Sequence, residues 1–177
     1  MKLECRYRII QDQINATRAA NENMARPADQ QKSTLRFQCD YTPDANWKLR
    51  TRCEFVKGGQ EFSAQQTGTL AFQDVGYQPE NGRWEIIMRY CLFQSGGSYA
   101  RMYAFENDVP YAFSLMQFND AGSRFYVLFS CRLRKGLQAY MRISDLYYPG
   151  KTYLSSGLDK INGSHQTDVK MVLKYMF

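Results

Sequence analysis

The sequence predicts an all-β protein: an antiparallel, up-and-down β-barrel of about ten strands that is part of a larger transmembrane barrel. Three observations lead to this prediction. Aromatic residues make up 15% of the 177 residues, and aromatic side chains favour strands. Apolar and polar residues alternate with a period of two, which is the periodicity of a strand. The C-terminal stretch TDVKMVLKYMF also alternates and ends on Phe177, as the last strand of an outer-membrane barrel does.

Seven segments alternate clearly, and the apolar phase of each holds no charged residue. These segments are 3–9, 35–41, 47–55, 84–92, 125–133, 137–143 and 167–177. Arginine, lysine and the acidic residues of these segments fall in the opposite phase. Each predicted strand therefore has one apolar face and one charged face.

Three further segments are less regular. Residues 67–77 change phase near Asp74, which predicts a β-bulge there. Residues 99–105 and 111–116 flank ENDVP, where Pro110 cannot donate a ladder hydrogen bond. We interpret ENDVP as a turn between two barrel strands, and one long bent strand is the alternative.

The lengths of the connections support that turn. If ENDVP is a turn between two strands, the long connections at 11–32, 57–66 and 147–166 all fall at the end of the barrel opposite the C-terminus. The short connections at 42–46, 78–83 and 134–136 fall at the other end. Outer-membrane barrels have this division into long external loops and short periplasmic turns.

Alternation alone does not distinguish a membrane barrel from a soluble ligand-binding barrel, in which the apolar phase would point inward. The bulky aromatic residues of the apolar phase favour the membrane, since the interior of a small barrel holds few of them. Aromatic residues also gather at the short-turn end, where an interfacial girdle would lie. The predicted girdle comprises Tyr41, Trp47, Tyr77, Trp84, Tyr175 and Phe177.

The charged phase predicts a lumen-facing ladder of ion pairs that fills a narrow barrel, and a pathway for anions is the alternative. The ladder comprises Arg6, Arg8, Arg36, Arg50, Arg52, Glu54, Arg89, Arg132 and Arg142. The net charge of +6 could also indicate nucleic-acid binding. We expect none by these residues, because stacking aromatics and charges lie on opposite faces.

The sequence points to no enzyme, metal, cofactor or identifiable small-molecule ligand. Its five cysteines include no CxxC pair, and four of them lie in the apolar phase as small hydrophobic residues. His165 is the only histidine, and a barrel-embedded hydrolase using it is the alternative. The polar residues near His165 in the sequence are Ser155, Ser156, Asp159, Ser164 and Asp168. The segment that contains them is typical of an ordinary polar loop.

The N-terminal stretch MKLECRYRIIQDQ has no apolar core of a secretory signal, and no run of about 18 apolar residues predicts a helical span. We therefore expect residues 1–177 to be either a single barrel domain or, as we favour, the C-terminal part of a longer barrel with its signal peptide upstream. The expected location is the outer membrane. The expected partners are membrane lipid and the barrel-assembly machinery, which would engage the C-terminal strand.

Several stretches resemble the Bacteroidetes outer-membrane proteins that contain helix-hairpin-helix (ComEA-like) domains. The most specific are ENDV-x-YAFS and SGLD-x-I-x-G, within RMYAFENDVPYAFS (101–114) and SSGLDKINGSHQTDVKMVLKYMF (155–177). The others are LRFQCDYTPDANWKLRTRCEFV (35–56), QDVGYQP (73–79), IIMRYCLF (86–93) and GSRFYVLFSCRLR (122–134). The resemblance covers residues 33–177, and cysteines in strand positions depart from it.

The resemblance implies that this chain is the end of a much longer barrel with a signal peptide, a helix-hairpin-helix segment and more strands upstream. It implies no catalytic residues and no defined molecular activity. A DNA-related role of the helix-hairpin-helix segment does not carry over to these residues.

Overall fold

The structure is a computed structural model that describes residues 1–15, 27–60, 64–154 and 160–176. In these ranges the chain forms β-strands, turns and one short 3-10 helix, η1 (Ser98–Ala100). The prediction of an all-β, antiparallel protein is confirmed. No helix in these ranges is long and apolar enough to cross a membrane.

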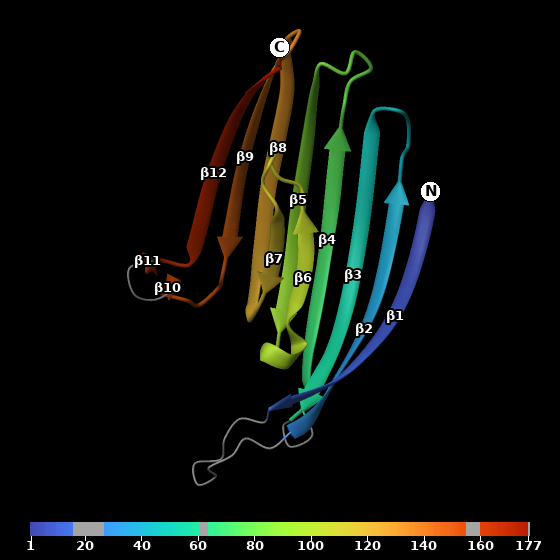
Figure 1. Cartoon of the computed structure of the whole chain (residues 1–177), viewed down its shortest axis with the longest axis vertical. Helices are drawn as coiled ribbons and strands as arrows, with labels where there is room; N and C mark the ends of the chain where they lie inside the picture. The colour runs from blue at the N-terminus through green and yellow to red at the C-terminus, as the bar shows by residue number, and fades with distance from the viewer. Residues whose placement is uncertain (16–26, 61–63, 155–159, 177) are drawn as a thin grey trace.

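The main sheet has eight strands in the described part of the chain, in the order β1-β2-β3-β4-β5-β8-β9-β12 (Figure 1). All neighbours are antiparallel, and chain order is interrupted only where hairpins are inserted. The sheet is twisted and curved in Figure 1, as long antiparallel sheets are. Its strands are β1 (Lys2–Asn15), β2 (Pro27–Tyr41), β3 (Trp47–Gln60), β4 (Gln66–Tyr77), β5 (Trp84–Ser95), β8 (Ala121–Arg134), β9 (Leu137–Tyr147) and β12 (His165–Tyr175).

The barrel itself is not closed in the described residues. β1 and β12 are the two edges of the main sheet, and each pairs with one neighbour there. Closure into a barrel therefore stays a prediction.

The two strands predicted around ENDVP do not belong to the main sheet, which has eight strands instead of about ten. They are β6 (Met102–Glu106) and β7 (Ser114–Phe118), and they pair with each other in a separate two-stranded sheet. Each has five residues, whereas a strand needs about 9–11 residues to span a bilayer. A period of two predicts a strand but does not indicate the sheet to which the strand belongs.

The β6–β7 hairpin lies over one face of the main sheet, in front of β5 and β8 in Figure 1. Apolar side chains pack between the hairpin and the sheet, including Phe118 against Phe93 with ring centroids 4.7 Å apart. The approach is close at Gly68, where an added Cβ would lie 2.6 Å from the carbonyl oxygen of Ala100. Glycine at this position lets the backbone before β6 sit directly on β4.

The bulge predicted near Asp74 is wrong. The register of β4 with β3 and with β5 is continuous, and the register shift in the main sheet lies between Arg132 and Arg134 of β8. The apparent change of phase in β4 arises because Leu70 and Phe72 lie on the covered face, together with Asp74. Where the hairpin covers the sheet, the otherwise charged face also carries apolar side chains, because these pack against the hairpin.

The connections divide between the two ends of the sheet as predicted, but the strands are longer than predicted: residues 11–15, 27–32 and 57–60, predicted as loop, belong to β1, β2 and β3. The turns after β2, β4 and β8 are short and lie at one end. The longer connections after β1, β3, β5 and β9 lie at the other end, where the β6–β7 hairpin and the small hairpin of β10 (Tyr153–Leu154) and β11 (Ile161–Asn162) are inserted.

Candidate functional site

The two faces of the main sheet differ sharply in chemistry. We call the face covered by the β6–β7 hairpin the charged face, and the opposite one the apolar face. Cross-strand register places residues from all eight strands on the apolar face, and the hairpin does not touch it. Its exposed large apolar side chains are Leu3, Tyr7, Ile9, Phe37, Tyr41, Trp47, Phe55, Trp84, Tyr90, Leu92, Phe125, Phe129, Met141, Ile143, Val169, Met171, Leu173 and Tyr175.

The aromatic residues of the predicted girdle lie on the apolar face near the short turns. Trp47 and Tyr77 have ring centroids 4.7 Å apart, and those of Tyr77 and Trp84 are 5.4 Å apart. Tyr41 and Tyr175 are exposed at the same end of their strands. Phe177 lies outside the described residues. The structure thus brings Trp47, Tyr77 and Trp84 into contact, and a role at a membrane interface stays a prediction.

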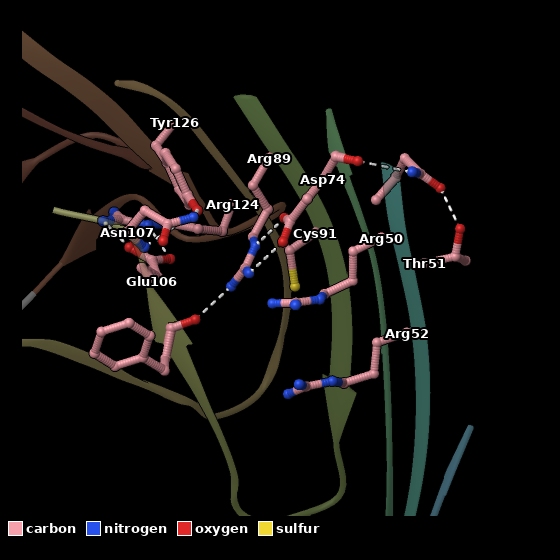
Figure 2. A network of polar contacts seen from close by, with 12 residues as sticks. Arg50, Thr51, Arg52, Asp74, Arg89, Cys91, Glu106, Asn107, Arg124 and Tyr126 are labelled. Atoms are coloured by element: carbon pink, nitrogen blue, oxygen red, sulfur yellow. Dashed lines mark hydrogen bonds and ion pairs between the residues drawn. The ribbon is translucent and has the colours of Figure 1, made fainter. Parts of the chain in front are cut away.

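On the charged face, β4 and β5 carry a buried ion pair. Arg89 is 3% exposed and donates from Nε and Nη2 to the two carboxylate oxygens of Asp74, at 2.5 and 2.7 Å (Figure 2). Its Nη1 donates to the carbonyl oxygen of Phe105 at 2.7 Å, which ties the sheet to β6. The guanidinium also lies 3.8 Å from the ring centroid of Phe72. All three nitrogens of Arg89 therefore have partners, as a buried guanidinium requires.

A second buried cluster centres on Glu106, the last residue of β6. Its carboxylate is fully buried and accepts hydrogen bonds from Arg124 of β8 and Arg142 of β9. Both Arg124 distances are 3.2 Å. Tyr126 adds an oxygen that accepts from the backbone and side chain of Asn107, at 3.3 and 3.2 Å. These contacts fasten the tip of β6 to the sheet.

Asp108, which follows the cluster in the connection to β7, reaches the last strand. Lys170 of β12 donates to its Oδ2 at 2.7 Å, and the Arg142 Nε lies 3.9 Å from its Oδ1. Burial alone would raise the pKa of Asp108, but the Lys170 hydrogen bond, a backbone hydrogen bond from Val109 and the charge of Arg142 lower it below its usual range. Asp108 is therefore ionised at neutral pH and holds the hairpin to β12.

The predicted ladder residues of β1–β3 lie on the same charged face but outside the hairpin. Arg36 donates to Glu54 at 2.7 Å, and the exposed pair Arg50–Asp40 has a distance of 2.5 Å. Arg52 also donates to Gln38 and lies over the ring of Phe72, and Arg6 pairs with Glu4. Arg8 and Arg132 are exposed and have no ion-pair partner among the described residues.

The structure thus separates the predicted ladder into two parts. Arg89 and Arg142 are buried under the hairpin, whereas Arg6, Arg8 and Arg50 remain exposed. Sequence reasoning missed Asp74, Glu106, Asp108 and Arg124 as partners in the buried part. A signal for Arg124 was its place in the charged phase of its strand, but Glu106 and Asp108 lie in a segment whose position only the tertiary structure gives.

The hydrolase alternative depends on His165. Its Nδ1 lies 2.8 Å from the Asp145 Oδ2, and its ring stacks on Tyr147 with centroids 4.5 Å apart. The structure gives it no hydrogen bond to Ser164 in the described ranges. Ser155, Ser156 and Asp159 of the predicted group lie outside the described residues.

The five cysteines are free thiols. Cys5, Cys39, Cys53 and Cys131 lie on the apolar face, whereas Cys91 is fully buried between the charged face and the hairpin. In the part of the chain described, no three histidine, cysteine or acidic side chains are grouped so that they could hold a metal ion.

Comparisons of the chain with protein-family models, with curated proteins and with solved structures found no match. The functional argument therefore depends on the two faces of the sheet and the residues between sheet and hairpin.

Proposed function

We propose that this chain forms part of the wall of an outer-membrane β-barrel, with the apolar face toward lipid and the charged face toward a polar interior. The protein would have a non-enzymatic role in transport or at the cell surface. In this proposal, the β6–β7 hairpin folds into the interior and narrows it, and the C-terminal strand engages the barrel-assembly machinery. The family resemblance carried by ENDV-x-YAFS and SGLD-x-I-x-G belongs to the same proposal.

One observation carries the proposal: the large side chains of the apolar face are exposed, while the charged side chains under the hairpin on the other face are buried. Met171 and Leu173 are 71% and 68% exposed, whereas Arg142 and Glu106 are 2% and 0% exposed. In water, this arrangement would leave an apolar surface across a whole sheet uncovered, and such patches mark contact with a membrane or a partner. A soluble barrel would instead bury the apolar phase.

The strand lengths also support the proposal. The strands of the main sheet have 11 to 15 residues, enough to cross the hydrocarbon core at the usual tilt. The aromatic contacts of Trp47, Tyr77 and Trp84 at the end of the apolar face would lie at the headgroup level.

The alternation of β12 offers a direct test. We would place a single cysteine at Met171 or at Val172 in a cysteine-free background and attach a polarity-sensitive fluorophore in lipid vesicles. Met171 lies on the apolar face, and its neighbour Val172 lies on the charged face. We expect lipid-like emission from position 171 and quenching by lipid-soluble spin labels there, with neither effect at position 172.

Equal exposure of positions 171 and 172 to a water-soluble quencher would overturn the membrane proposal. A chain that stays monomeric and folded in buffer without detergent would support the soluble ligand-binding barrel instead.

A further inference from the structure

We infer that a pocket on the charged face of β1–β3 binds a small, soluble, phosphoryl-bearing anion. The pocket has a volume of about 340 Å³, within the range of small-molecule sites. Five cationic side chains line it, namely Arg6, Arg8, Lys32, Arg36 and Arg101, together with one carboxylate, Glu54. This inference depends on the fold and goes beyond the proposed place of the chain in a membrane.

The charges of this pocket are not balanced. Arg36 pairs with Glu54 at 2.7 Å and Arg6 pairs with Glu4 at 2.8 Å. Within the described residues, Arg8, Lys32 and Arg101 have no carboxylate within ion-pair distance, and Glu54, whose charge also acts on Lys32, is already paired with Arg36. Three positive groups therefore remain for a ligand.

A contact between β2 and the segment before β6 brings two of these cationic residues together at the pocket. Lys32 donates from Nζ to the backbone carbonyl oxygen of Arg101 at 2.5 Å, so the two cationic residues are held together. The Arg101 Nε is buried and has no hydrogen-bond partner in the described ranges. The buried Nε of Arg142, in the cluster under the hairpin, also lacks a hydrogen-bond partner among the described residues, so Arg101 contributes to the pocket through the positive charge of its guanidinium.

The other half of the same face shows what a purely structural set of charges looks like. There, Arg89 is paired with Asp74, and Arg124 and Arg142 share Glu106. Acidic residues neutralise those arginines and fix the hairpin. Among the described residues that line the pocket of β1–β3, Glu54 is the one acid, and it is already paired with Arg36.

The chemistry of the lining favours a phosphoryl group. Guanidinium groups bind phosphate through two parallel hydrogen bonds, and an ammonium adds a compact charge. The pocket opens on the face opposite the exposed apolar side chains, so its ligand would come from the aqueous phase instead of a lipid headgroup.

Calorimetric titration of inorganic pyrophosphate into the full chain tests this inference. The protein would be held in micelles of an uncharged, phosphate-free detergent at fixed ionic strength, so that no lipid phosphate competes. We expect saturable binding with one site per chain. Binding that needs a phospholipid instead of added pyrophosphate would overturn the assignment to a soluble ligand.

Arg8→Gln is the main variant, since Arg8 is exposed and has no ion-pair partner in the described residues, so the fold does not need it. We expect its affinity for pyrophosphate to fall about tenfold, as loss of one charged hydrogen bond implies. Arg101→Gln is expected to lower it at least as much, and Arg101→Lys to recover part of the loss.

Arg132→Gln is the matched control, because Arg132 is an exposed arginine of the charged face outside the pocket. We expect its affinity to match that of the unmodified chain. Absence of binding, or an equal loss in Arg8→Gln and Arg132→Gln, would overturn the inference, since the second result would mean general attraction to a basic surface.

Discussion

At the scale of single residues, the carboxylate of Glu106 stands out. It is the fully buried acid that joins β6 to two strands of the main sheet through Arg124 and Arg142. Taking these charges out of water is costly, and their mutual contacts offset that cost only while every partner is present. The buried charge of Arg89 is likewise offset by its contacts with Asp74 and with the carbonyl oxygen of Phe105.

Glu106→Gln should therefore destabilise the protein strongly. The change leaves Arg124 without a counter-charge and Arg142 with only the more distant Asp108, and breaking a buried pair costs about 3–5 kcal/mol. Urea-induced unfolding in lipid vesicles, followed by tryptophan fluorescence, would measure the free energy of unfolding.

Glu85→Gln is the matched control for that change. Glu85 pairs with Lys48 at 3.8 Å on the more exposed part of the charged face, and such pairs contribute about 1 kcal/mol or less. Equal losses in Glu106→Gln and Glu85→Gln would contradict the distinction between buried and exposed pairs.

At the scale of elements, two features determine how this chain is organised: the opposite faces of each strand and the docking of the β6–β7 hairpin. β12 shows the first feature, with Met171 on the apolar face beside Val172 on the charged face. The hairpin shows the second, since its core residue Phe118 packs on Phe93 of β5.

Met171→Arg tests the orientation of β12. If the apolar face contacts lipid, a charge there should lower the free energy of unfolding in vesicles by about 2–4 kcal/mol. Val172→Arg, one residue along the same strand, places the same charge on the charged face and should cost clearly less. A larger loss for Val172→Arg than for Met171→Arg would mean that the strand faces the other way.

Phe118→Ala tests the docking of the hairpin. Phe118 is 1% exposed, and truncating a buried phenylalanine costs about 3–5 kcal/mol, so the hairpin should open more often. Cys91 lies beneath the hairpin, and its labelling rate with a water-soluble thiol reagent would report the opening in a variant whose other cysteines are replaced.

Phe113→Ala is the control for hairpin docking, because Phe113 is 78% exposed. We expect the labelling rate of Cys91 to be unchanged in this variant. An unchanged rate in Phe118→Ala as well would indicate that the ion pairs of Glu106 hold the hairpin without its apolar core.

At the scale of the whole molecule, the open edges of the main sheet matter most. β1 and β12 each have one neighbour in the described residues, so half of their backbone groups point away from the sheet. Unpaired backbone groups cost several kcal/mol each in hydrocarbon, and open edges are not found there. In a bilayer these edges would have to pair, with each other or with further strands.

Hydrogen exchange tests that expectation. In lipid bilayers, we expect the backbone amides of β1 and β12 to exchange as slowly as those of β4, which has a neighbour on each side. NMR spectroscopy of the exchanged protein would give the rates residue by residue. Fast exchange of the outward-pointing amides of β1 and β12, with slow exchange in β4, would show that the edges stay open to water.

Much of the fold could be predicted from the sequence because the alternation of a strand is local. Leu3, Phe37 and Met141 could be assigned to one face without knowledge of any partner strand, and the register places them there. The positions of Trp47, Tyr77 and Trp84 at one end followed from the lengths of the short connections. The place of β6 and β7 could not be predicted, because five alternating residues fit a main sheet and a separate hairpin equally well.

The sequence by itself therefore determined the all-β class, the two faces of the regularly alternating strands and the end of the sheet at which Trp47, Tyr77 and Trp84 lie. Only the tertiary structure decided that the hairpin covers the charged face, that Glu106 neutralises Arg124 and Arg142, and that Lys32 meets Arg101 across 69 positions of chain. The physical reason is that side-chain alternation records the local direction of each residue. Contacts between distant segments depend on which strands pair, and they leave no periodic trace in the sequence.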